Sequence, residues 1–183
     1  KYIRYFGAGT EKVEEMTAEA FPDATIERLD LDTVRRKGSI ESILTRFGKG
    51  KTDILIGTQL VAKGLDFANV GLVGIVAADI SLNIPDYRSA ERTFQLITQA
   101  AGRAGRGTTP GKVVIQSYTP EHYAIQLAAE QDYGSFYEAE IKIRDQIGYP
   151  PYCDILYMVL AAESEEEAAT GAVKIKEAFL RRV

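Results

Sequence analysis

Short apolar runs alternate with helical patterns through the first two-thirds of the chain, and this order limits the fold more than any other feature. Each run is bounded by turn residues, as is typical of buried strands. Strands separated by helices pair in parallel, which predicts an α/β fold with a parallel sheet flanked by helices on both faces. Ligands bind such sheets at the carboxyl ends of the strands, so we expect functional residues in the loops after strands. The runs cover residues 26–29, 54–56, 70–76 and 113–115.

Between these runs, apolar residues recur at the spacing of helices with one buried face. Val13, Met16 and Ala20 predict one such face, and residues 40–47 predict another. A third apolar face, which carries Phe94 and Ile97, leads into a glycine-rich segment.

The pattern changes after Ser117, where helical stretches follow one another without strands between them. The sequence Gly-Tyr-Pro-Pro-Tyr at 148–152 then breaks the chain. Beyond it, Ser164 begins a capping-box sequence that opens a helix. We therefore predict an α/β domain with trailing helices over 1–147 and the beginning of a small α+β domain over 148–183. The elements expected after Ser117 are helices at 120–131 and 134–146 and a strand at 154–162.

Charge is divided unevenly along the chain. The net charge is −4, but residues 1–119 carry 16 basic against 14 acidic side chains, whereas residues 120–183 carry 6 against 12. Contact with phosphate needs a local basic surface and not a basic protein. Nucleic acid is therefore compatible with the first part and disfavoured for the acidic second part.

Other features narrow the class of protein. Cys153 is the single cysteine, so the chain can form no internal disulfide and no thiolate metal cluster. It has neither an apolar run of membrane-spanning length nor a targeting segment at its start, so we expect a cytoplasmic protein with no membrane partner. Because it lacks an initiator Met and its last helix has no stop signal, we expect a piece of a longer protein.

Two glycine-containing segments imitate nucleotide-binding motifs. Gly50-Lys51-Thr52 matches the end of a P-loop, but a helix precedes it and a strand follows, the reverse of the order that a P-loop needs. Gly7-Ala-Gly9 follows a strand and opens a helix, and Asp30 and Asp32 lie near the position of a ribose ligand. A dinucleotide-binding enzyme is therefore a distant alternative, weakened by Lys12 where a small residue is required.

The segment from Gln99 to Gly107 is the most informative in the chain. It places Arg103 and Arg106 three residues apart, where a helix gives way to a glycine-rich turn. Glycines on both sides remove side-chain bulk, and a planar guanidinium suits bidentate contact with phosphate. A basic surface turn is the simpler alternative, but it does not explain the apolar helix that leads into the segment.

This Gln-x-x-Gly-Arg-x-Gly-Arg pattern resembles motif VI of the superfamily 2 helicases. Residues 54–67 resemble motif V of that family, Gly9-Thr10-Glu11 resembles motif IV, and the three occur in the family's order. The sequences of residues 78–95 and 148–151 are similar to those of the replication-restart helicases within the family. The resemblance covers essentially the whole chain and implies a RecA-like second motor lobe.

The resemblance implies a role for individual residues near the nucleotide. Arg106 corresponds to the arginine finger and Arg103 to a second contact with the γ-phosphate, both neutralising charge during phosphoryl transfer. Gln99 is expected to order the motif, and Gly64 and Asp66 to approach the nucleotide's sugar or nearby water.

A second group is expected to hold DNA. Thr58 follows a strand, and its hydroxyl and backbone amide suit a DNA phosphate, with Gln59 and Lys63 beside it in motif V. Thr10 lies at a helix start, where unpaired amides favour an anion. A simple N-cap role for Thr10 is nearly as well supported. His122, the single histidine, we take as structural.

The implied activity of the intact protein is ATP-driven 3′→5′ DNA unwinding in replication restart. Its partners would be forked and single-stranded DNA, single-strand DNA-binding protein and primosome proteins. ATP and Mg²⁺ would be bound mainly by a first lobe, whose P-loop lysine and acidic pair are not in this sequence, so we expect the chain alone to be inactive. Zinc is expected in the intact protein, with ligands outside this chain. A DNA translocase without unwinding activity is the nearer alternative.

Overall fold

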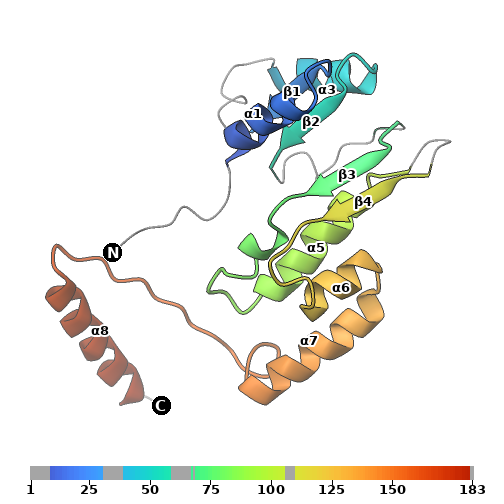
Figure 1. Cartoon of the computed structure of the whole chain (residues 1–183). Coiled ribbons are helices and arrows are strands. Elements are labelled where there is room, and N and C mark those ends of the chain that lie inside the picture. Colours follow the sequence, from blue (N-terminus) through green and yellow to red (C-terminus); the bar gives the residue numbers. More distant parts are fainter. Residues whose placement is uncertain (1–8, 31–38, 59–66, 68, 106–109, 182–183) are drawn as a thin grey trace. The chain divides into compact units, whose positions relative to one another are not determined.

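The computed structural model describes residues 9–30, 39–58, 67, 69–105 and 110–181, and these form two compact units, Lys1–Ile143 and Arg144–Val183. Figure 1 shows the elements of both units along the chain. No helix in the described part of the chain is long and apolar enough to cross a bilayer.

The first parallel strand pair joins β1 (Ile26–Leu29) to β2 (Ile54–Gly57), with Ile26 opposite Ile54 and Leu29 opposite Gly57. Helix α1 (Thr10–Ala20) packs on both strands, and α3 (Ser39–Gly48) contacts β1. Leu29, Ile43 and Ile56 are buried between these elements.

The apolar face predicted for α1 is wrong in part. Val13 is half-buried, but Met16 is 57% exposed, and none of the residues of α1, all of which the structure describes, is fully buried. The half-buried positions include Glu14 and Thr17, because Glu14 forms an ion pair with Arg28 of β1 and the hydroxyl of Thr17 donates to the carbonyl oxygen of Val13. Polar partners thus replace part of the expected apolar contact.

The second strand pair joins β3 (Leu72–Ile75) to β4 (Lys112–Ile115), again in parallel, with Leu72 opposite Lys112. Helix α5 (Ser89–Ala101) lies between them in sequence and packs on β3 (Figure 1). The predicted α/β class and parallel strand pairing are confirmed. Among the described residues the strands form two separate pairs and not one continuous ladder.

The main core gathers around α5. Phe94 and Ile97 of α5 are 4% and 2% exposed, and the ring of Phe94 stacks on Phe136 with ring centroids 4.2 Å apart. The core also contains Ala78, Ala124, Ile125 and Ala128, which come from the short helix η1 (Ala78–Ile80) and from α6 (Tyr123–Ala129). Burial of large apolar side chains contributes about 1.5–3 kcal/mol each, so this cluster anchors α5.

Asp79 ties together the loops that follow β3 and β4. Its carboxylate is 4% exposed and accepts hydrogen bonds from the hydroxyl of Ser117, the amide and hydroxyl of Thr119, and the amide of Tyr118 at 3.0 Å. Burial alone would raise the pKa of Asp79, but these hydrogen bonds lower it well below the usual range of an aspartate. The buried charge is thus satisfied by neutral donors from one loop.

Helix α7 (Tyr133–Ile147) crosses the boundary between the units, and α8 (Glu165–Leu180) follows in the second. The hydroxyl of Ser164 accepts from the amide of Glu167 at 3.2 Å, which confirms the predicted helix cap. The strand predicted at 154–162 is wrong: the structure assigns these described residues to no strand, and Tyr157 is 84% exposed. An apolar run forms a strand only where a second strand supplies hydrogen bonds.

We predict that Asp79→Asn destabilises the chain by about 2 kcal/mol at neutral pH, because an amide oxygen is a weaker acceptor and its NH₂ group faces buried donors. Since the folded pKa lies below the unfolded value of about 4, this contribution is present above about pH 4 and is lost as the pH falls further. Urea unfolding at several pH values measures it. The exposed Asp23→Asn is the control, and a cost that does not shrink at low pH would contradict the role of the charge.

Candidate nucleotide and nucleic-acid site

The last turn of α5 delivers the arginine segment to the strand pair β3–β4. The amide of Arg103 donates to the carbonyl oxygen of Ala100, which continues the helix as a tighter turn. The amide of Gly105 then donates to the carbonyl oxygen of Val70 at 3.0 Å, just before β3 begins. The segment is therefore attached to the entrance of β3.

Two glycines let the backbone close at this point. Gly105 has φ +73°, a left-handed conformation that residues with a side chain rarely adopt. A Cβ on Gly105 would lie 2.6 Å from the amide nitrogen of Gly111, and a Cβ on Gly111 would lie still closer to the amide nitrogen of Gly105. We name residues 102–105 together with Gly111 the arginine turn.

The arginine turn precedes two strands, whereas the sequence pattern predicts functional residues after strands. Val70 and Gly111 precede β3 and β4, so the turn lies at the amino ends of this parallel pair. Thr58 agrees with the expectation, because it follows β2 directly and is exposed at that strand's carboxyl end. The reason is connectivity: α5 starts after the carboxyl end of β3 and must return along the strand before β4 can begin.

Gln99 lies in the last turn of α5, and Arg103 lies two residues beyond the end of the helix at Ala101, in the tighter turn that follows. The side chain of Gln99 is exposed and that of Arg103 is half-buried. The other predicted nucleotide and DNA contacts, Arg106, Gly64, Asp66, Gln59 and Lys63, lie outside the described residues.

Thr10 is engaged within the chain. Gly9 is the N-cap of α1 and Thr10 is its first residue, so the N-cap interpretation of Thr10 is wrong. Its hydroxyl donates to Oδ2 of Asp30 at 2.7 Å, and the same oxygen pairs with Nη1 of Arg28 at 3.2 Å. The hydroxyl thus links the start of α1 to the end of β1, which leaves the helix amides as the groups able to face an anion.

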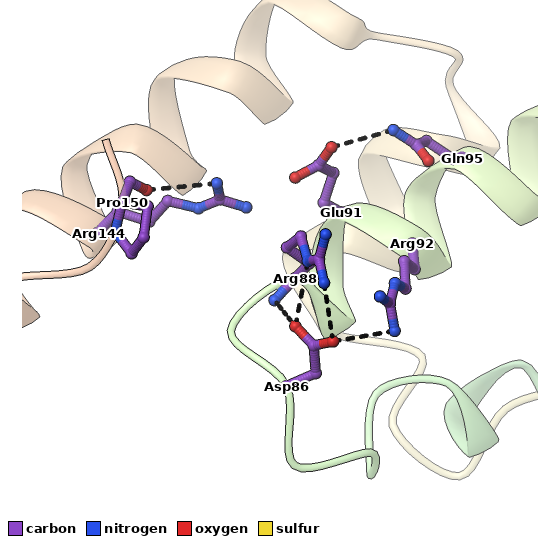
Figure 2. A network of polar contacts seen from close by, with 7 residues as sticks. All are labelled: Asp86, Arg88, Glu91, Arg92, Gln95, Arg144 and Pro150. Carbon is purple, nitrogen blue, oxygen red and sulfur yellow. Dashed lines mark hydrogen bonds and ion pairs between the residues drawn. The ribbon is translucent and has the colours of Figure 1, made fainter. Parts of the chain in front are cut away.

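A second polar network fixes the start of α5 (Figure 2). Asp86 accepts from the amide of Arg88 at 2.9 Å and pairs with Nη1 of Arg92 at 3.0 Å, while Nε2 of Gln95 donates to Glu91 at 3.1 Å. The backbone hydrogen bond from Arg88, followed by that residue's side chain, lowers the pKa of Asp86. This network sets the direction of the helix that carries the arginine turn at its other end.

The Gly50-Lys51-Thr52 segment and His122 both have structural roles. Gly50 adopts φ +68° in the turn that ends α3, and the buried hydroxyl of Thr52 donates to Glu27 at 2.7 Å, so this segment has the geometry of a helix end and not of a P-loop. His122 is the N-cap of α6: its Nδ1 accepts from the amide of Ala124 at 3.2 Å, and burial lowers its pKa. The structural assignment of His122 is confirmed.

Comparison with known proteins decides the family. The model of the helicase conserved C-terminal domain matches residues 3–108. The chain belongs to the helicase C-terminal domain family. That match includes all three segments that resemble helicase motifs.

The chain is also similar to replication restart protein PriA from several bacteria. It is 54% identical to the Bacillus subtilis protein over 94% of this chain, 48% identical to the Synechocystis protein over 91%, and 40% identical to the Thermotoga maritima protein over 95%. These alignments cover 21%, 20% and 23% of the respective relatives. The chain thus spans about a fifth of the length of the relatives it matches.

Sequence reasoning missed Gly111 and the Asp86 network. Pro110-Gly111 directly before a predicted strand was a signal for a close backbone approach, because glycine at a strand entrance often marks one. Asp86 accepts a hydrogen bond from the amide two residues later, a turn that aspartate commonly forms, just before a helix starts.

We predict that Thr10→Val destabilises the chain by about 1 kcal/mol, because the nearly buried carboxylate of Asp30 loses a hydrogen bond. Thr10→Ser keeps the hydroxyl and should retain most of the stability. Urea unfolding compares the two variants, and a larger loss for Thr10→Ser than for Thr10→Val would mean that the methyl group of Thr10, and not its hydroxyl, matters.

Proposed function

We propose that this chain is the second motor lobe of an ATP-dependent 3′→5′ DNA helicase that acts in replication restart and primosome assembly. The observation that carries the proposal is an arginine turn, in a chain of the helicase C-terminal domain family, attached to the amino ends of a parallel strand pair. High identity to replication restart proteins supports the process in which the enzyme works.

The arginine turn fits a nucleotide phosphate. Gln99 lies in the last turn of α5 and Arg103 lies just beyond it, and Gly105 and Gly111 have no side chains to stand between the backbone and a ligand. In our proposal Arg106 and Arg103 contact the γ-phosphate of ATP bound mainly by the first lobe, and Gly64 and Asp66 lie near its sugar. Bound ATP supplies the phosphoanhydride whose cleavage drives the motor, while the two guanidiniums stabilise the charge that grows on the phosphoryl oxygens.

The DNA contacts belong to a different strand end. Thr58 follows the carboxyl end of β2 and is exposed to solvent. We propose that it holds a DNA phosphate together with Gln59 and Lys63. Thr10 takes part through the amides at the start of α1, since its hydroxyl donates to Asp30. In our proposal the nucleotide lies at the amino ends of β3 and β4, whereas the DNA lies at the carboxyl end of β2.

Movement follows from closure of the cleft between the lobes. ATP draws the arginine turn inward, hydrolysis releases it, and the change in spacing moves the strand held near Thr58. Mg²⁺ and zinc would be held by residues outside this chain. The partners in our proposal are forked and single-stranded DNA, single-strand DNA-binding protein and primosome proteins.

A translocase without unwinding activity remains the nearer alternative, because both activities use the same lobes. Unwinding of a forked duplex that carries a fluorophore and quencher, compared with displacement of a bound protein from single strands, separates them. The dinucleotide alternative is disfavoured because Asp30, its ribose ligand, is engaged by Thr10 and Arg28.

We predict that Arg106→Ala in the full-length enzyme lowers ATP turnover by about 10³-fold and leaves single-strand DNA affinity within a few-fold. Arg106 acts on transition-state charge, whereas DNA is held elsewhere. Steady-state ATPase kinetics and fluorescence anisotropy measure the two effects, with the exposed Arg181→Ala of α8 as the control.

If Arg106→Ala weakened DNA binding and ATP turnover in parallel, the arginine turn would be a DNA-binding or folding element and the proposed division of labour would be wrong. A normal ATPase rate in Arg106→Ala would mean that Arg106 does not act at the nucleotide site.

We predict that Lys63→Ala weakens single-strand DNA binding of the full-length enzyme equally for all sequences and reduces the salt slope of binding by about 0.7, because one phosphate contact is lost. Anisotropy titrations at several salt concentrations measure the slope. Lys142→Ala, which removes an exposed lysine from α7, is the matched control.

The acidic part of the chain gives the opposite test. Glu165→Lys and Glu166→Lys on α8 should leave specific affinity nearly unchanged at physiological salt. If these reversals changed DNA affinity more than Lys63→Ala does, our proposal would have placed the DNA on the wrong unit.

A further inference from the structure

Gly111 lies outside the arginine motif, yet its backbone contacts that motif directly. The motif segment ends in the sequence at Gly107, and Gly111 is the residue immediately before β4. A Cβ on Gly111 would collide with the amide nitrogen of Gly105 and would lie 2.6 Å from the Cβ of Ala104. Side chains do not approach backbone at such distances, so this contact is available only to glycine.

Neither side of the contact can move without the loss of a backbone hydrogen bond. Gly105 is tied to Val70 through its amide, and Lys112, next to Gly111, donates from its own amide to the carbonyl oxygen of Gly71 at 2.9 Å. Both neighbours of the contact are thus hydrogen-bonded to the same short segment before β3. Any side chain at Gly111 must break one of these bonds or displace the segment that carries Arg103.

We propose that Gly111 is a positioning residue of the motor, which sets where Arg103 stands relative to the nucleotide. The inference rests on the proposed function for its catalytic part. The step from structure to rate is geometric: displacement of a catalytic group by about 1 Å is enough to cost about 100-fold in rate.

Gly71 provides a matched control. It is a glycine at the same end of the same strand pair, it is exposed, and an added Cβ there meets nothing within 4 Å. Gly71→Ala therefore makes the same chemical change beside the arginine turn without the collision.

The experiment compares Gly111→Ala and Gly71→Ala in the full-length enzyme. We expect Gly111→Ala to lower the kcat of DNA-stimulated ATP hydrolysis by about 100-fold, to leave single-strand DNA affinity within a few-fold, and to leave the thermal midpoint close to that of Gly71→Ala. Hydrogen–deuterium exchange supplies a readout without ATP: the amide of Gly105 should exchange at least about 10-fold faster in Gly111→Ala than in Gly71→Ala.

Each result decides between the possibilities. Equal kcat and equal exchange in the two variants would overturn the proposal, as would a Gly111→Ala protein that unfolds as a whole, because the contact would then serve general folding. Faster exchange at Gly105 with an unchanged kcat would overturn the positioning role while leaving the contact real. If the unsubstituted enzyme hydrolysed no ATP, the proposed function would fail, and the exchange comparison would still test the contact by itself.

Discussion

The buried face of α5 is the constraint on which the candidate site depends. Phe94 and Ile97 are held in the core by Phe136 and by the small residues of α6, so the helix cannot rotate without exposing large apolar side chains. Because the helix is fixed, both of its ends are fixed. Its first turn is held by Asp86, and its last turn carries Gln99 and Arg103 to the entrance of β3. A catalytic arginine on a turn gains its accuracy from this rigid helix.

The polar anchors of the unit work by satisfying buried charge with nearby donors. Asp79 receives hydrogen bonds from the loop after β4, while Asp30 receives them from Thr10 and Arg28. Each carboxylate joins segments distant in the sequence, and each would be costly to bury alone. Loops at the ends of short strands are thereby ordered without a large apolar surface of their own.

Much of the fold could be predicted from periodicity, and the failures have physical causes. The strands at 26–29 and 54–56 were found because short apolar runs between turn residues have few other uses. Met16 was misplaced because apolar spacing does not reveal an ion pair, here Glu14 with Arg28, that takes over the contact. The strand at 154–162 failed because a strand depends on a partner that local sequence does not specify.

The candidate site shows the same limit at finer scale. The arginine motif could be recognised in the sequence because it combines charged residues with glycines. Its place at the amino ends of β3 and β4 depends on Val70 and Gly111, whose side chains have no functional groups that would mark them in the sequence.

The hydrogen bond from Gly105 to Val70 has a consequence for coupling in the motor. Val70 lies a few residues after the segment that resembles motif V, and Gly105 lies in the segment that resembles motif VI, so one backbone hydrogen bond joins the two regions. If nucleotide displaces the arginine turn, as we propose, this hydrogen bond would pass the displacement to the chain before β3. Energetic coupling requires such a contiguous element with two arrangements, and in this domain the joined turn is the element that closure of the lobes would shift. Gly105 and Gly111 permit the close approach at this turn, so in our proposal two residues without side chains set how the two regions move together.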